Sequence, residues 1–151
     1  MYEANQTSTS RFRNNRHKAV ANILYTYNTV TSRLQRILGE KNLTLQQYNL
    51  LRILARLHPE PACNFAIRNQ MFDSRSDVTR IVDRLIKEGL AVRKHCCQDR
   101  RKVDINITEK GLSLLEEMDR LNDKMDGIVS SLTHQELEEL NRILEKVRSS
   151  T

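Results

Sequence analysis

The spacing of apolar residues limits what this 151-residue chain can fold into more than any other feature of the sequence. From residue 20 to residue 88, and again from residue 108 onward, apolar side chains recur every three or four positions, which is the period of an amphipathic helix. Over residues 90–107 the period falls to two, which is typical of strands with one buried face. The sequence therefore predicts a mainly α fold with a small β-hairpin.

Capping and helix-breaking residues mark out the first two helices. A helical stripe of apolar residues ends at Leu38, and Gly39 is expected to end the first helix just beyond it. Thr44 and Gln47 have the spacing of a capping box, in which each side chain bonds the backbone amide of the other residue. The tetrapeptide His-Pro-Glu-Pro at 58–61 ends the second helix, because proline disfavours helix in the residue before it and donates no amide.

Two more helices are expected in close succession. A short helix over 62–71 is expected to bury three side chains: Phe65, Ile67 and Met71. The next helix has the clearest buried face, with apolar residues at i, i+3, i+4, i+7 and i+8: Val78, Ile81, Val82, Leu85 and Ile86. Ser74 or Asp73 is expected to cap this helix, with Asp77 in its first turn, and Gly89 is expected to end it.

The opposite side of this fourth helix is polar and carries a series of arginines. Two helices joined by a few residues have the layout of a helix-turn-helix, whose second helix enters the major groove of DNA. Arginine can donate to guanine edges or phosphates, and serine and threonine can contact either. Any amphipathic surface helix also carries charges outside, so this alternative remains open. The outward residues are Arg75, Ser76, Asp77, Thr79, Arg80, Asp83 and Arg84.

Residues 90–95 and 103–107 predict a β-hairpin with a basic tip. The tip could follow the DNA backbone or insert an arginine into a narrow minor groove. Asp99 is the discordant acid, and we expect it to pair with Arg101 and hold that side chain in position. An ordinary solvated turn is the alternative. The cations of the tip are Arg100, Arg101 and Lys102.

The net charge of +6 is distributed unevenly along the chain. Residues 1–61 carry +6 and residues 62–104 carry +4, whereas residues 105–151 carry −4. A basic front suggests contact with a polyanion such as nucleic acid, although many basic proteins bind none.

The acidic rear of the chain carries two further helical stripes. Thr108 is expected to open a long helix that continues to Leu132, and Thr133 and Glu136 have the spacing of a second capping box before the last helix. These stripes hold too many large apolar residues for a freely solvated end. We expect two chains to pair through their terminal helices; packing onto the same chain's core is the alternative.

The sequence offers little for catalysis or metal binding. Its four histidines lie in unrelated contexts, and it has no nucleophile elbow, glycine-rich phosphate loop or paired-carboxylate cluster. His95, Cys96 and Cys97 are soft ligands, but adjacent residues seldom chelate one zinc ion and no fourth ligand is evident. We therefore expect neither an enzyme nor a bound metal or cofactor.

Cysteine usage and hydropathy predict a cytoplasmic protein. Three cysteines without regular spacing favour a reducing compartment. No apolar run approaches the ~20 residues of a membrane span, and residues 1–10 lack a signal-peptide core, so no membrane contact is expected. Cys96 and Cys97 lie near Arg93 and Lys94, whose charge favours the thiolate. These two thiols are candidates for a redox switch.

Three segments together form a specific signature: 76–85 (SDVTRIVDRL), 89–93 (GLAVR), and 99–101 (DRR) followed by 107–111 (ITEKG). With this signature the sequence resembles the MarR (multiple antibiotic resistance) family of winged helix-turn-helix regulators over about residues 18–148. The resemblance implies an obligate homodimer, a reading helix over 75–88 and a wing over 90–107 whose Arg101 is braced by Asp99.

The resemblance also implies a division of the chain and exposes departures from the family pattern. An arm and first dimerisation helix would span 1–40, the winged DNA-binding lobe 41–108, and the C-terminal dimerisation helices 109–151. Phe72 stands in a turn that usually has a small residue, and Arg68 stands where alanine is usual and could add a phosphate contact. Cys96 and Cys97 replace the usual approach to the wing.

Taken together, these features predict a homodimeric transcriptional regulator that binds a palindromic double-stranded operator. It is expected to be a repressor that is relieved by a small aromatic or phenolic effector or, less expectedly, by thiol oxidation. A winged-helix module that binds proteins and not DNA is the rival. The predicted DNA contacts are Arg75, Ser76, Asp77, Thr79, Arg80, Arg84, Asp99, Arg100, Arg101 and Lys102. The resemblance puts the effector between the dimerisation region and the winged lobe, with four candidate contacts: Tyr25, Tyr27, Arg52 and Arg56.

Overall fold

The structure, a computed structural model, describes residues 12–73, 75–95 and 103–149 of the chain. It is mainly helical with a small antiparallel sheet, which confirms the predicted fold class. In chain order the elements are α1 (Asn15–Gly39), α2 (Leu45–Leu57), β1 (Ala62–Cys63), α3 (Asn64–Gln70), α4 (Val78–Lys87), β2 (Ala91–His95), β3 (Val103–Ile107), α5 (Glu109–Asp119), α6 (Asn122–Asp126), the 3₁₀ helix η2 (Gly127–Val129) and α7 (His134–Ser149).

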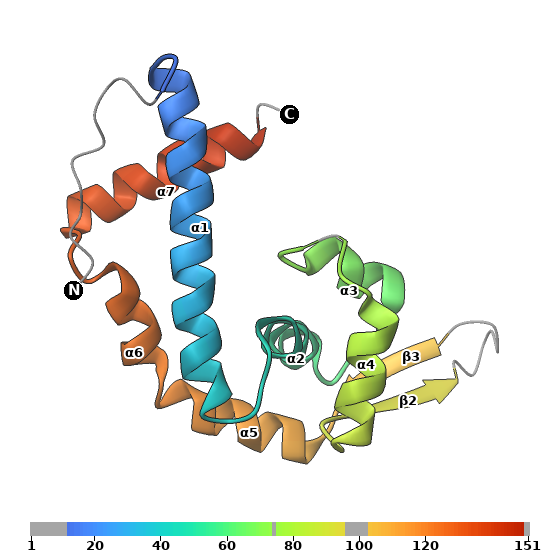
Figure 1. The fold of residues 1–151 in the computed structure, drawn as a ribbon. Helices are drawn as coiled ribbons and strands as arrows, with labels where there is room; N and C mark the ends of the chain where they lie inside the picture. The colour runs from blue at the N-terminus through green and yellow to red at the C-terminus, as the bar shows by residue number, and fades with distance from the viewer. Residues whose placement is uncertain (1–11, 74, 96–102, 150–151) are drawn as a thin grey trace.

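The molecule consists of a lobe and a long helical extension (Figure 1). Helix α2 lies at the centre of the lobe, with α3, α4, α5 and the sheet around it, whereas α1 extends well beyond the lobe. Helix α7 lies at the opposite end of the molecule from the β2–β3 hairpin. The core of the lobe is built from fully buried side chains of these elements, among them Leu50, Leu54, Ile67, Leu85, Ile105 and Met118.

The first two helices begin and end close to the predicted positions. The capping box is confirmed: the Gln47 amide donates to Thr44 Oγ1 at 3.2 Å, and the Thr44 amide donates to Gln47 Oε1 at 2.9 Å. Gly39 is the last residue of α1 rather than the residue beyond it. The left-handed residue in the turn to α2 is Asn42, with φ 55°, because an asparagine side chain tolerates this conformation.

The prediction for residues 62–71 is partly wrong. Ala62 and Cys63 form a short strand that pairs with β3, with Ala62 opposite Ile105, and the helix begins only at Asn64. Ile67 is fully buried as expected, but Phe65 is 73% exposed. Two helical positions are separated by about 200°, so Phe65 and Ile67 point to opposite sides of α3.

The hairpin and the buried face of α4 agree with the prediction. Strands β2 and β3 pair antiparallel with Arg93 opposite Ile105, and β1 adds to the other edge of β3. On α4 the side chains of Val78, Val82 and Leu85 are buried, and the other two predicted inward residues pack against the same core: Ile81 and Ile86.

The long helix expected after Thr108 is broken in the structure. Helix α5 ends at Asp119, whose carboxylate accepts a hydrogen bond from the Asn122 side chain at 3.2 Å. Such local side-chain bonds compete with the helical ladder, and a new turn starts at Leu121. The capping box before α7 is confirmed, because the Thr133 amide donates to Glu136 Oε2 at 2.8 Å.

Candidate nucleic-acid interface

Helix α4 starts later than predicted, and its cap is a different residue. The Asp77 side chain accepts a hydrogen bond from the Arg80 amide at 3.2 Å, so Asp77 is the N-cap rather than a residue of the first turn. Asp73, one of the two predicted caps, instead accepts from the Arg75 amide at 2.9 Å in the preceding turn. The other predicted cap, Ser74, lies outside the described residues. The helix therefore occupies the inner part of the 75–88 segment that the resemblance implied.

The outer side of α4 presents unpartnered cations. Arg75, Thr79, Arg80 and Arg84 are exposed, and so is Lys87 at the last helical position. Among the described residues, the guanidinium groups of the three arginines make no hydrogen bond or ion pair. A guanidinium without an intramolecular acceptor keeps all five of its donors for a ligand.

Two of the predicted contact residues on this helix have other roles in the structure. The Asp77 carboxylate is occupied by the cap described above. Ser76 is half-buried, and its hydroxyl oxygen is buried without a hydrogen-bond partner among the described residues. The predicted wing-tip contacts and the redox candidates lie outside the described residues: Asp99, Arg100, Arg101, Lys102, Cys96 and Cys97.

An ion pair joins α4 to the hairpin. Asp83 was expected to point outward without a partner, but Arg93 of β2 donates to its carboxylate at 2.7 Å. The pair neutralises the only acidic side chain within α4, and it links the strand that leads to the hairpin tip with the helix. Sequence reasoning missed this contact because the ten-residue separation gives no periodic signal.

A dense junction connects the end of α4 with the start of α5. Gly89 adopts the left-handed conformation, with φ 72°, and its carbonyl accepts from Thr108 Oγ1 at 2.7 Å. Lys110 Nζ donates to the carbonyl of Glu88 at 2.7 Å, where a cation also suits the C-terminal end of the helix dipole. A Cβ atom on Gly111 would lie 2.4 Å from the carbonyl oxygen of Leu90, so only glycine fits. These contacts explain why residues 89–93 and 107–111 carry a recognisable pattern.

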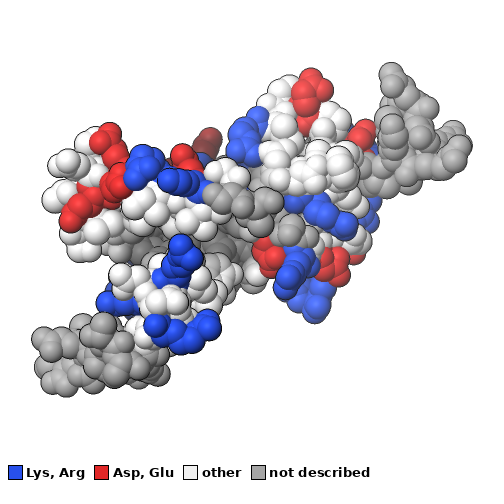
Figure 2. Space-filling model, turned by 90° about the horizontal axis from the view of Figure 1, so that it is seen from above, with Lys and Arg blue, Asp and Glu red and all other residues white. Residues whose placement is uncertain are grey.

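A groove of about 320 Å³ lies beside the first turns of α4 and includes residues that the sequence analysis did not select. Thr44 and Gln46, at the start of α2, line it together with Arg80 and Arg84. Seen from above, Lys and Arg side chains surround the end of α1 and also gather over the lobe, where acidic side chains are mixed with them (Figure 2). Charge alone therefore does not single out one surface, and the case for α4 depends on its geometry.

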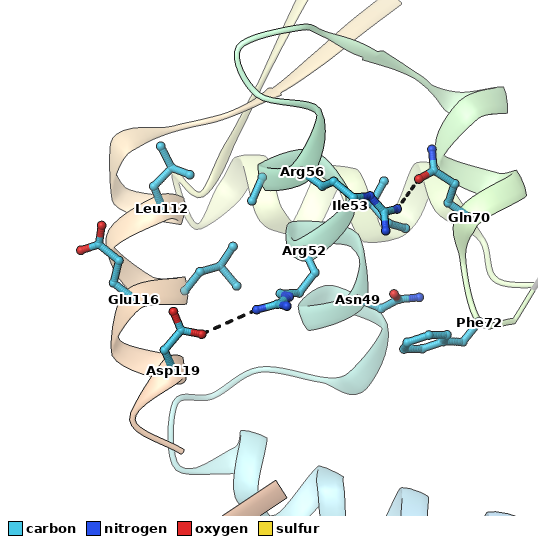
Figure 3. Close-up of a pocket in the computed structure, with 11 residues that line it drawn as sticks. Asn49, Arg52, Ile53, Arg56, Gln70, Phe72, Leu112, Glu116 and Asp119 are labelled. Carbon is cyan, nitrogen blue, oxygen red and sulfur yellow. Dashed lines mark hydrogen bonds and ion pairs between the residues drawn. The ribbon is translucent and has the colours of Figure 1, made fainter. Parts of the chain in front are cut away.

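The four predicted effector contacts are divided between different parts of the molecule. Arg52 and Arg56 line a groove of about 640 Å³ between α2, α3 and α5 (Figure 3). Tyr27 lines a separate cavity between α1, α2 and the turn that leads to α4. Tyr25 is exposed and lines neither of these two spaces. The structure therefore does not bring the four side chains into one site.

Within residues 12–73, 75–95 and 103–149, no helix is both long enough and apolar enough to cross a membrane. In the same three segments, no three His, Cys, Asp or Glu side chains lie together as they would around a metal ion.

The sequence model of the MarR family matches residues 43–103, which contain α2 to the end of the hairpin loop. The chain is similar to the HTH-type transcriptional regulator FarR of Neisseria gonorrhoeae, with 32% identity over 103 residues that cover 67% of this chain and 68% of FarR. The chain belongs to the MarR family. Members of the MarR family are transcription regulators rather than enzymes.

Two solved structures extend the likeness to the whole fold. A MarR transcription factor from Planctomyces limnophilus is 31% identical, with a TM-score of 0.68 over 85% of this chain and 93% of that chain. A mutant of MarR from Escherichia coli complexed with operator DNA has a TM-score of 0.77 over 84% of this chain and 91% of that chain. The second protein is only 20% identical, so it supports the fold alone.

Proposed function

We propose that this MarR-family regulator binds a palindromic double-stranded operator as a homodimer, with α4 in the major groove. The observation that carries the proposal is the two-sidedness of α4. Its inner side is sealed into the core by Val78, Val82 and Leu85, so the arginines of its outer side have no route to an intramolecular partner on the described lobe. An amphipathic helix held in this way can enter the groove of a duplex without rearrangement of the core.

The residues proposed to touch DNA fall into three groups. Thr79 and Arg80 stand at the start of α4, the part of a recognition helix that reaches base edges. Arg75 precedes the helix and Arg84 lies one turn farther along it, where phosphate contacts are expected. The hairpin tip contributes Asp99, Arg100, Arg101 and Lys102, and the Arg93–Asp83 ion pair supports this part by tying β2 to α4.

We propose that the homodimer forms through α1 and α7, with a second copy of this chain covering their apolar side chains. Leu24 of α1 is 59% exposed and Val147 of α7 is 52% exposed, and α7 has no buried residue. This exposure supports pairing over the alternative that α7 packs onto its own chain. The proposed division is thus 1–40 and 109–151 for dimerisation and 41–108 for DNA binding.

The regulator is further proposed to act as a cytoplasmic repressor that releases DNA when a small aromatic effector binds between the dimerisation helices and the lobe. The support is a cavity in that position, lined by α1, α2 and the turn before α4. Tyr27 is the one predicted effector contact that lines it.

Selection of bound duplexes from a random DNA pool tests this function. A homodimer with two reading helices is expected to enrich palindromes whose half-sites lie about 10 base pairs apart, centre to centre. Binding should disappear in a variant with Arg80→Ala and Arg84→Ala. A pool without enrichment, or equal binding by this variant, would instead favour a winged-helix module that binds an acidic protein.

A further inference from the structure

We propose that the effector is an uncharged single-ring aromatic compound that occupies the cavity between α1, α2 and the α3–α4 turn, and that Asn49 selects it by hydrogen bonding. The inference deepens the proposed function and rests on it for its regulatory consequence. Binding of the compound itself is a property of the free protein and is argued from the cavity alone.

The cavity has the size and lining of a site for one aromatic ring. Its volume is about 230 Å³, whereas an apolar cavity of about 150 Å³ suffices for benzene. Helix α1 contributes one wall, α2 a second, and the turn before α4 a third. The apolar side chains of these walls are Tyr27, Val30, Leu34, Leu45, Met71 and Phe72.

Two polar groups on the cavity lining lack a strong partner. Asn49 is only 6% exposed, and its amide nitrogen donates to the sulfur of Met71 at 3.6 Å, which is a weak acceptor. The hydroxyl oxygen of Ser76 is buried and has no hydrogen-bond partner among the described residues. Buried polar groups are normally paired, because an unpaired one loses its hydration without compensation. A ligand with one polar substituent would supply the missing partner to Asn49.

The charges around the cavity exclude an anion. The described residues that line it include no Lys, Arg or His, and one of them, Asp73, is acidic. A carboxylate or phenolate held there would lose its hydration without a compensating cation and would face a like charge. An uncharged amide or hydroxyl substituent meets neither cost.

The groove that does contain arginines is a poorer site for an anion than its composition suggests. Arg52 points across the groove to Asp119 of α5, with 3.6 Å between Nη1 and Oδ1, and Arg56 donates to Gln70 of α3 (Figure 3). An anion would have to displace these partners. Asn49 and Phe72 also line this groove, at the end where it approaches the cavity.

The cavity shares part of its wall with the DNA-facing groove. Gln46, Asp73 and Ser76 line both the cavity and the groove that contains Arg80 and Arg84. A ligand in the cavity therefore touches residues whose other side borders the proposed DNA contacts. Occupancy is expected to change the position of the turn before α4 and with it the affinity for DNA.

Benzamide and benzoate form a matched pair of probes, because they have nearly the same shape and differ in charge. Each is titrated into the full-length protein without DNA, and binding is followed by NMR chemical shifts and by the melting temperature. We expect benzamide to bind at least tenfold more tightly than benzoate. Asn49→Leu, which keeps the side-chain volume and removes the amide, is expected to weaken benzamide binding at least tenfold.

Two further variants separate the cavity from the arginine groove. Val30→Phe fills the cavity from α1 and should abolish benzamide binding, which keeps the test decisive if Asn49→Leu does not fold. The double variant Arg52→Gln and Arg56→Gln should bind benzamide as the natural chain does. Tighter binding of benzoate, loss of benzamide binding in the arginine variant, or no binding of either compound at millimolar concentration would overturn the inference. Because no DNA is present, these outcomes are independent of the operator selection.

Discussion

Replacement of Arg84 by alanine tests whether α4 faces the DNA backbone. Its guanidinium group is exposed and makes no hydrogen bond or ion pair among the described residues. The substitution therefore breaks no internal contact and leaves no buried group unpaired. Arg84 lies about one turn beyond Arg80 on the helix, so we expect it to contact a phosphate rather than a base edge.

The expected magnitude follows from the number of charges removed. A homodimer loses two cations, one from each protomer, and each phosphate contact contributes about −0.9 to the slope of log K against log salt concentration. The slope should therefore become less steep by about 1.8. Over a fourfold rise in salt, the variant should lose roughly 12-fold less affinity than the natural chain does.

Fluorescence anisotropy with a selected duplex at 50 to 200 mM salt measures both slopes. Arg120→Ala is the matched control, because it removes one exposed arginine at the end of α5, away from α4. The control should leave the slope unchanged. An unchanged slope for Arg84→Ala, or an equal change in the control, would refute the proposed orientation of α4.

Three further predictions concern the fold and the dimer. Gly111→Ala should lower stability by about 2–3 kcal/mol in urea unfolding because its Cβ meets the Leu90 carbonyl, whereas Gly39→Ala, with nothing within 4 Å, should be neutral or slightly stabilising; equal stability of the two variants would contradict this account. Ile143→Glu should convert the dimer to a folded monomer in sedimentation equilibrium, and a persisting dimer would exclude α7 from the interface. Hydrogen bonds from the Thr133 backbone and hydroxyl lower the pKa of Glu136 below its ordinary value, so the stability contributed by its carboxylate should be present at neutral pH and lost as the pH falls below about 4.5. Glu136→Gln should remove this acid-sensitive part of the unfolding profile, and identical profiles would contradict the assignment.

Features that depend on one local period were predictable from the sequence. The buried face of α4 requires only five apolar residues at helical spacing, and the hairpin requires only alternation. The two capping boxes are equally local, since Thr44 and Gln47 satisfy each other within four residues. Gly89 is likewise set by the backbone conformation that ends α4.

Features that depend on competition or on distant contacts were not predictable. Asp73, Ser74 and Asp77 are all able to cap a helix, and the choice of Asp77 is made by the geometry of the turn before α4. Strand β1 exists only because β3, about 40 residues later, offers an edge to Ala62.

The candidate effector site illustrates the same limit. Tyr27 and Arg52 were grouped because both belong to helices expected to surround an effector. The structure separates them, since Tyr27 faces the cavity beside α1 and Arg52 pairs with Asp119 of α5. Helical periodicity gives the face of each helix but not the distance between two faces, which is set by packing around α2.

The turn between α3 and α4 is where effector and DNA binding meet. Asp77 caps α4, Asp73 borders both spaces and holds the Arg75 amide, and Met71 accepts the weak bond from Asn49. An effector can shift the position of α4 only by as much as it binds one arrangement of this turn better than another. Because coupling between two sites is reciprocal, an effector that weakens DNA binding by some factor must itself bind the DNA complex more weakly by that factor. The rigid junction at the other end of α4, where Thr108 and Lys110 bond the backbone of residues 88–89, leaves the N-terminal end of the helix as the part that can respond.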